Sequence, residues 1–298
     1  MRIPWRKGRA APVIRDDQDR QRLVRQLAVE ALRRRGVQVR PAPEDVLGDD
    51  WLVGQDGYQY RLYNLQLVCS QLPQADWAAR VEFHFDQMLA GRSAPDIGEL
   101  SEPELLAQIR TRLQPKDGSG LQSLGYVRPA FDGLVVELNR DLPTTVVTLG
   151  DSSVDGRDLD FLYQVGQRNT NAEPTTSETV GPGVLALTGD SFFIASKALD
   201  MPHLVASLFG AAPLGVVFSV PHRSLLFLHP VGPHTLEAVQ WLAPVTLGQT
   251  QEPPGGAVSR DTYYWHGGVV QPITRLDNES AAIEIRVEGM FGEALSQL

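Results

Sequence analysis

The sequence predicts an α+β fold: a mixed, mainly antiparallel sheet with helices packed on it and a helical N-terminal arm. Apolar residues recur at helical spacing in the first third of the chain, whereas short apolar runs of strand length dominate the rest. Short turns, such as residues 55–57 and 221–223, join neighbouring runs and are typical of hairpins.

The length and composition are those of an ordinary globular protein. The chain has 298 residues, of which 42% are hydrophobic and 21% charged, enough for one large or two modest domains. We expect a disordered basic lead-in at 1–15, an N-terminal α/β region at 16–115 and a C-terminal α+β domain at 120–298. The Gly/Ser-rich stretch 116–125 is the expected boundary.

The first helix is predicted over 17–35. Asp16 and Asp17 supply an N-cap with favourable negative charge, and Gly36 follows the last turn. A second N-terminal signature, Ser101-Glu102-Pro103-Glu104, has the capping-box pattern and predicts a helix that runs to about 113. Between them we expect strands at 37–39, 51–53 and 58–62, and helices at 64–72 and 74–89.

The C-terminal part alternates between strands and helices. The polar segment 169–183 predicts an exposed loop, and 184–188 with 191–194 predicts a hairpin. The near-continuous apolar runs 214–220 and 224–228 predict central strands that are buried on both faces. The remaining expected strands are 134–139, 144–149, 261–265 and 282–287, and the expected helices are 155–168, 195–209 and 235–247.

The net charge of −9 is unevenly distributed. Residues 1–40 hold 12 Lys/Arg against 4 Asp/Glu, whereas the rest holds 15 against 32. The basic arm is interpreted as folding onto the acidic body or as a solvated helix face; nucleic-acid binding through residues 1–40 is the alternative. An acidic surface suits a basic protein partner.

Cellular location follows from the same survey. No apolar stretch reaches the ~20 residues of a membrane-spanning helix, so no membrane partner is expected. The basic N-terminus lacks the apolar segment of a secretory signal, which favours the cytoplasm. The single cysteine, Cys69, lies in an apolar run and is interpreted as a buried small hydrophobe.

Familiar catalytic and cofactor motifs are missing from the sequence. It contains no phosphate-binding loop, nucleophile elbow or zinc-protease motif, and no cofactor is expected. His222, His229 and His234 lie close in sequence, near Glu237. Because a strand between His222 and His229 would separate them by about 20 Å, we expect no metal site.

Several residues nevertheless stand out as candidate binding positions: Asp190, Ser196, Arg223, Tyr264 and Trp265. Asp190 and Arg223 lie in turns beside apolar strands, and an internal ion pair between them would explain both. Tyr264 and Trp265 belong to an aromatic cluster that suits a protein partner, although core packing accounts for it as well. Strand alternation would bury Trp265 and expose Tyr264.

The segments around these residues resemble a known family. They are Arg140–Thr144, a helix that ends at Asn169, the run Asp190-Ser-Phe-Phe-Ile-Ala-Ser196, and Pro221-His-Arg223 between strands. Over about 125–270 this order resembles the YtpQ-like family of uncharacterised bacterial cytosolic proteins, and Tyr63-Asn64-Leu65 is similar to its front end. The resemblance implies an α+β fold and brings no established activity.

Two function classes remain. The first is a non-enzymatic cytosolic protein-binding protein, an adaptor or an immunity-type protein that neutralises a toxin by covering it. The alternative is an enzyme of unknown reaction built around Asp190, Ser196, Arg223 and His222, which requires these side chains to lie within hydrogen-bond reach of one another.

Overall fold

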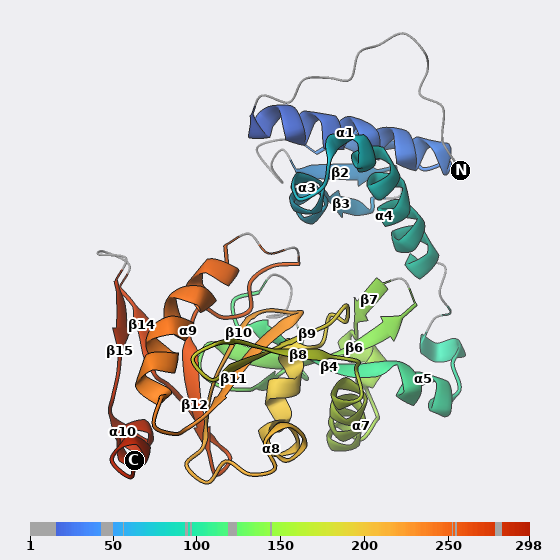
Figure 1. Ribbon diagram of the computed structural model, residues 1–298. Coiled ribbons are helices and arrows are strands. Elements are labelled where there is room, and N and C mark those ends of the chain that lie inside the picture. Colours follow the sequence, from blue (N-terminus) through green and yellow to red (C-terminus); the bar gives the residue numbers. More distant parts are fainter. Residues whose placement is uncertain are drawn as a thin grey trace. The chain divides into compact units, whose positions relative to one another are not determined.

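The computed structural model of the chain describes residues 16–42, 50–55, 57–92, 95, 97–118, 124–143, 145–251, 253, 255–277 and 282–298. The expected lead-in at 1–15 lies outside these residues. The chain divides into two compact units, which we call the N-terminal unit (Met1–Arg92) and the C-terminal unit (Ser93–Leu298). The expected boundary near 116–125 therefore differs from the observed one (Figure 1).

In its described residues, the N-terminal unit packs helices α1, α3 and α4 around a small antiparallel sheet (Figure 1). Helix α1 begins where predicted, because the side chain of Asp16 accepts a hydrogen bond from the backbone N–H of Asp19. Cys69 is fully buried in the core, as expected. The elements are α1 (Asp17–Arg34), β1 (Val39–Pro41), β2 (Trp51–Gly54), β3 (Gln59–Arg61), α3 (Tyr63–Ser70), η1 (Gln74–Asp76) and α4 (Trp77–Arg92).

The core of this unit follows the helical spacing in the sequence. On α4, Trp77, Val81 and Phe85 recur every four residues and are all buried. They pack in one cluster with Val24 and Leu32 of α1 and with residues of the sheet. Burial of one stripe on each helix fixes which face of α1 and α4 contacts the sheet.

The C-terminal unit is the larger of the two and is an α+β structure, as predicted; every pair among the described strands is antiparallel. It comprises η2 (Ile97–Glu99), α5 (Glu102–Gln108), β4 (Ile109–Pro115), β5 (Arg128–Pro129), β6 (Leu134–Leu142), β7 (Thr145–Thr148), α6 (Asp151–Val154), α7 (Leu159–Asn171), β8 (Thr176–Gly181), β9 (Val184–Thr188), η4 (Ala195–Asp200), α8 (Met201–Leu208), β10 (Val216–His222), β11 (Leu225–Pro230), α9 (Thr235–Gln249), β12 (Thr262–His266), β13 (Val269–Pro272), β14 (Thr274–Leu276), β15 (Ile283–Ile285) and α10 (Gly289–Leu295).

A large sheet with the strand order β13-β12-β10-β11-β9-β8 forms the middle of the unit. Val216 and Phe218 of β10 face a core that includes η4 and α8, whereas Val217 faces the core built with α9. Both faces of β10 and β11 are therefore buried, which confirms the prediction of two central strands.

The second sheet of the unit corrects the prediction of a helix over 101–113. The capping box of Ser101 and Glu104 is present, but α5 ends at Gln108 and β4 begins at Ile109. From there apolar and polar residues alternate, and β4 pairs along its whole length with β6. This pairing places residues 102–115 in the C-terminal unit, and it explains why the boundary lies before them.

The segment 169–194 also differs from its prediction. The expected loop contains strand β8, whose residues Thr176–Val180 are all exposed. The expected hairpin between 184–188 and 191–194 does not form: β9 pairs with β8 and β11, and 191–194 forms turns that lead into η4. Within the described residues, no helix is long and apolar enough to cross a membrane.

Candidate functional site

The structure brings the segment 190–196 against the turn at 222–224. The backbone N–H of Ala195 donates to the carbonyl oxygen of Arg223 at 3.0 Å, and the Ser224 hydroxyl donates to the carbonyl oxygen of Ser191 at 3.3 Å. Asp190 is exposed, and no ion pair joins it to Arg223 in the described structure. The two turns meet, but through their backbones and not through the expected ion pair.

Ser196 has a structural role beneath this contact. Its side chain is buried, and its hydroxyl oxygen accepts a hydrogen bond from the backbone N–H of Leu113 at 2.9 Å. Ala195 and Ser196 together therefore hold the Arg223 turn beside strand β4. A hydroxyl in this position is not presented to a substrate.

The predicted aromatic pair, Tyr264 and Trp265, is largely buried. Tyr263 and Tyr264 are both buried, because opposite faces of β12 contact different cores. The hydroxyl of Tyr264 donates to the carbonyl oxygen of Leu214 at 2.8 Å. Trp265 is half-buried and packs against the core that contains Tyr263. The expectation that Tyr264 is exposed was wrong, because α9 and α10 cover its face of the sheet.

Arg223 occupies an unusual environment. Its guanidinium carbon lies 3.7 Å from the ring centroid of Phe192, in a cation–π contact. The backbone of Gly255 also lies against the guanidinium, since a methyl group in place of its α-hydrogen would overlap the Arg223 atoms. Within the described structure, the guanidinium of Arg223 has no hydrogen-bond acceptor and no carboxylate partner. The guanidinium of Arg223 is thus in contact with the ring of Phe192 and with the backbone of Gly255.

A second guanidinium, that of Arg112 on β4, lies near the first. Its nearest carboxylate is Glu137 on the neighbouring strand β6, with 4.0 Å between Nη1 and Oε1. Glu137 is 1% exposed; its Oε1 accepts a hydrogen bond from Gln114, and its Oε2 has no hydrogen-bond partner. The Arg112 side chain is 18% exposed, so it remains reachable from solvent.

The charges of these groups affect one another. Burial, with a smaller contribution from the nearby charge of Arg112, lowers the pKa of Arg223 to about 10. Burial also lowers the pKa of Arg112, which the carboxylate of Glu137 partly offsets. Two cations and one carboxylate leave this region with a net positive charge inside an otherwise acidic unit.

His222 lies beside this region. Burial lowers its pKa, and the charge of Arg223 adds to the decrease, whereas a side-chain hydrogen bond with Gln249 opposes it. Its Nδ1 accepts a long hydrogen bond, 3.4 Å, from the backbone N–H of Ser224. The imidazole is therefore neutral near pH 7 and contributes no positive charge.

Arg112, Glu137 and Phe192 were missed by the sequence prediction. The signal for Arg112 was the period-two alternation of 109–115, which places Arg110, Arg112 and Gln114 on the same face of a strand. The capping box at Ser101 outweighed this signal, because the helix that it predicts was extended to about residue 113 and so included the alternating residues. Nothing in the local sequence indicates that Arg112 and Arg223 are neighbours.

The expected absence of a histidine metal site can be compared with the geometry. Both ring nitrogens of His229 are used, one with the carbonyl oxygen of Gly183 at 2.8 Å and one with the hydroxyl of Thr235 at 3.1 Å. Among the residues that the structure describes, no group of three or more His, Cys, Asp or Glu residues has the arrangement of a metal site.

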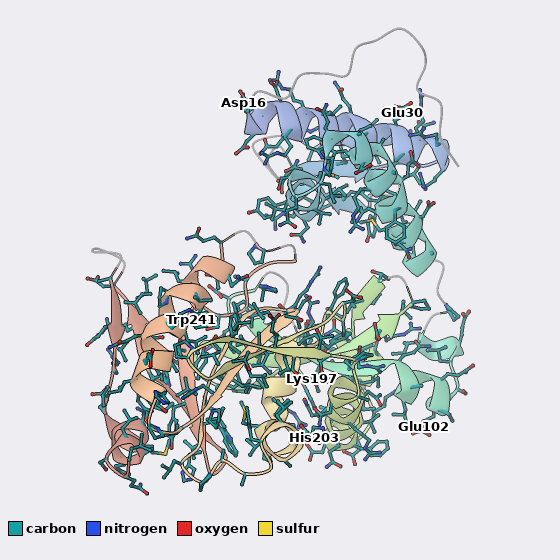
Figure 2. All side chains as sticks on the ribbon, viewed as in Figure 1. Asp16, Glu30, Glu102, Lys197, His203 and Trp241 are labelled. Atoms are coloured by element: carbon teal, nitrogen blue, oxygen red, sulfur yellow. The ribbon has the colours of Figure 1, made fainter. Side chains whose placement is uncertain are left out.

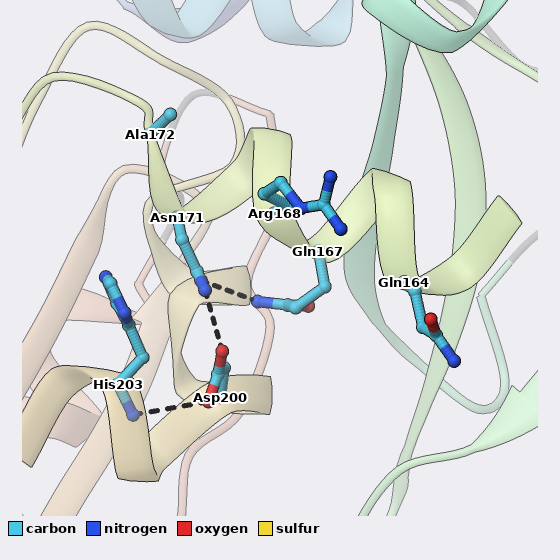
Figure 3. A pocket seen from close by; sticks show the side chains of 7 residues that line it. All are labelled: Gln164, Gln167, Arg168, Asn171, Ala172, Asp200 and His203. Atoms are coloured by element: carbon cyan, nitrogen blue, oxygen red, sulfur yellow. Dashed lines mark hydrogen bonds between the residues drawn. The ribbon is translucent and has the colours of Figure 1, made fainter. Parts of the chain in front are cut away.

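A polar pocket of about 580 Å³ opens between α7 and the start of α8 (Figure 3). The Asn171 side chain donates to Asp200 at 2.7 Å and accepts from Gln167 at 2.9 Å. Asp200 in turn accepts from the backbone N–H of His203 as the N-cap of α8. The side chains of Gln167, Asn171 and Asp200 thus tie the C-terminal end of α7 to the start of α8.

Two arginines of the basic N-terminal segment also have partners. Arg35 contacts Glu82 at 2.5 Å and Asp86 at 2.6 Å, and Arg34 pairs with Glu82 as well. These carboxylates lie on α4, against which α1 packs. Arg34 and Arg35 at the C-terminal end of α1 are therefore paired with acidic residues of their own unit, and the interpretation of the arm as a whole stays a prediction.

Strand β8 is the remaining surface feature of interest. It forms one edge of the large sheet, and among the described strands it pairs with β9 alone. At its end, Gly181 lies against the ring of Trp241, which is labelled in Figure 2.

Comparison with protein-family models, curated proteins and solved structures finds no match to this chain, so the resemblance to the YtpQ-like family stays a prediction.

Proposed function

We propose that this protein is a non-enzymatic, cytosolic binding protein, an adaptor or an immunity-type protein, whose C-terminal unit takes an extended basic segment of a partner protein along β8. The observation that carries this proposal is the state of the β8 edge. An exposed edge strand offers a row of backbone donors and acceptors to which another strand can add.

Proline and lysine, two residues with which proteins often block such pairing, are missing from this edge, although the β8–β9 register shifts between Thr179 and Gly181. Residues Thr176–Val180 are exposed, and the segment 176–181 contains no proline, no lysine and one charged residue, Glu178. At the opposite edge, β13 ends at Pro272, and Gln271 is bonded to the carbonyl oxygen of Glu288 and to the N–H of Phe291. The open edge is therefore β8.

Charge favours a basic segment as the occupant. Residues 93–298 hold 12 Lys/Arg against 24 Asp/Glu, and Glu178 lies in the middle of β8. A lysine or arginine opposite Glu178 forms a favourable cross-strand pair, and the acidic unit accelerates the approach of a basic partner. Backbone hydrogen bonds then supply affinity that does not depend on the other side chains.

Paired proline variants test the proposal. Successive residues of a strand direct their N–H groups to opposite sides, so one of Glu178 and Thr179 points its N–H outward and the other toward β9. We expect the outward-facing proline variant to keep the wild-type melting temperature and lose the partner, whereas the other proline variant lowers the melting temperature.

The partner is recovered from the source cell by cross-linking to the full-length protein and is then tested in purified form. Glu178→Lys should weaken its binding at least tenfold, and the matched change Asp155→Lys, at an exposed residue of the same unit, should not. Equal binding by the wild type, Glu178→Lys and both proline variants would exclude β8 as the docking edge.

The enzyme alternative has less support. It requires Asp190, Ser196, Arg223 and His222 to act together, but the Ser196 hydroxyl is buried and bonded to the backbone, and Asp190 is exposed apart from Arg223. Binding through Tyr264 is likewise less favoured than binding through β8, because its hydroxyl is already bonded inside the unit.

A further inference from the structure

We propose that Arg112 and Arg223 together form a binding site for an oxyanion, a phosphate or a carboxylate group of a ligand. This site is separate from the β8 edge and does not depend on it. The observations that carry the proposal are two neighbouring, partly buried guanidinium groups whose N–H donors form no hydrogen bond to any residue that the structure describes.

The first observation concerns the N–H donors of Arg223, for which the described residues supply no hydrogen-bond acceptor. A guanidinium withdrawn from water loses the hydration of its charge and of its N–H donors, so in folded proteins it normally contacts an acceptor. Arg223 contacts a ring and a glycine, and in the described part of the chain no oxygen accepts from it. Its in-plane donors are therefore available to a ligand.

The second step is the position of Arg112. Its only carboxylate neighbour in the described structure, Glu137, lies at the limit of ion-pair distance and also accepts a hydrogen bond from Gln114. Arg112 is therefore not saturated by Glu137. Together the three charges leave a surplus of one positive charge, which an oxyanion neutralises.

The third step is preorganisation. The Ala195 N–H holds the backbone of Arg223, and the adjacent Ser196 hydroxyl holds β4 at Leu113, next to Arg112. Phe192 and Gly255 restrict the plane of the Arg223 guanidinium. The Arg223 guanidinium is thereby restrained next to Arg112, and guanidinium groups bind phosphate and carboxylate oxygens through paired N–H donors.

A comparison with Arg128 shows what is distinctive about the pair. Arg128 also stacks on an aromatic ring, that of Tyr163 at 4.2 Å, but it forms an ion pair with Asp160 at 2.7 Å. The same kind of contact thus occurs in this unit with a carboxylate supplied by the protein. Among the described residues Arg223 has no such carboxylate, and we assign its oxyanion to a ligand.

Calorimetric titration of the full-length protein tests the site, with inorganic phosphate, sulfate and acetate as separate probes at constant ionic strength. We expect saturable binding of at least one probe. Preference for phosphate or sulfate indicates a phosphoryl-type ligand, and preference for acetate indicates a carboxylate.

Arg112→Gln and Arg223→Gln should each weaken this binding at least tenfold, whereas Arg128→Gln, which removes the same charge from a stacked arginine, should leave it unchanged. If a glutamine variant does not fold, Arg223→Lys takes its place. Lysine keeps the positive charge but lacks the paired N–H donors of the guanidinium, so this variant should also weaken binding. Absence of saturable binding, or equal binding by the wild type and a folded Arg223 variant, would overturn the proposal.

Discussion

The hydroxyl oxygen of Ser196 accepts a hydrogen bond from the backbone N–H of Leu113, 2.9 Å away, and so ties the 3₁₀ helix η4 to strand β4. Replacement by alanine leaves this buried N–H without an acceptor. We expect Ser196→Ala to reduce the free energy of unfolding by about 1–3 kcal/mol in urea titrations.

The control for this variant is Ser207→Ala. Ser207 is exposed, and its hydroxyl donates only within its own helix, to the carbonyl oxygen of Leu204. The change should stay within about 0.5 kcal/mol of wild type. A Ser196→Ala protein as stable as this control would show that the bond contributes nothing.

Gly181 at the end of β8 lies so close to Trp241 that an added Cβ would approach its ring atoms within 2.7–2.8 Å. We expect Gly181→Ala to destabilise the protein by about 1–3 kcal/mol, because the indole must shift in a packed environment. Gly248 on α9 has nothing within 4 Å of an added Cβ, so Gly248→Ala should stabilise by up to about 1 kcal/mol. The opposite order of stabilities would contradict the packing of Trp241 on β8.

His84 predicts a pH dependence of the N-terminal unit. Burial, with a smaller contribution from Arg80, lowers the pKa of His84 to about 4 from its usual 6.5. Between these values the unfolded chain binds more protons than the folded protein, so stability falls as the pH decreases from 6.5 to 4. The loss should amount to no more than about 3 kcal/mol.

Urea titrations at pH 7, 5.5 and 4.5 measure this effect. The His84→Leu variant lacks the titrating group, so its stability should change less over the same interval. An identical slope in both proteins would mean that His84 is protonated without cost in the folded state.

Cys69 should be unreactive in the folded protein. Its side chain is fully buried, and burial raises the pKa of the thiol to about 11. Thiolate is the reactive species, so the native protein should resist a disulfide reagent at pH 8 and react rapidly once urea unfolds it. Rapid modification without urea would show that the N-terminal unit opens readily.

Local interactions explain the parts of the fold that could be predicted. The Asp16 cap, the capping box at Ser101 and the Trp77–Val81–Phe85 stripe each involve residues within a few positions of one another, and all are present. The central position of β10 and β11 was equally readable, because strands buried on both faces must be apolar throughout.

The errors occur where a distant strand decides the structure. The predicted helix after Gln108 is a strand because β6 supplies its partners, and the polar segment at 176–181 is a strand because β9 does. Tyr264 is buried because α9 and α10 cover its face of the sheet. None of these partners is visible in the local pattern.

The sequence alone thus determined the α+β class, the starts of α1 and α5, the central strands and the acidic character of the C-terminal part. Only the tertiary structure decided that Arg112 and Arg223 are neighbours, that Ser196 serves the backbone and that β8 is an open edge. Capping and periodicity act within a turn or two of chain, whereas these contacts depend on which strands pair and which faces are covered.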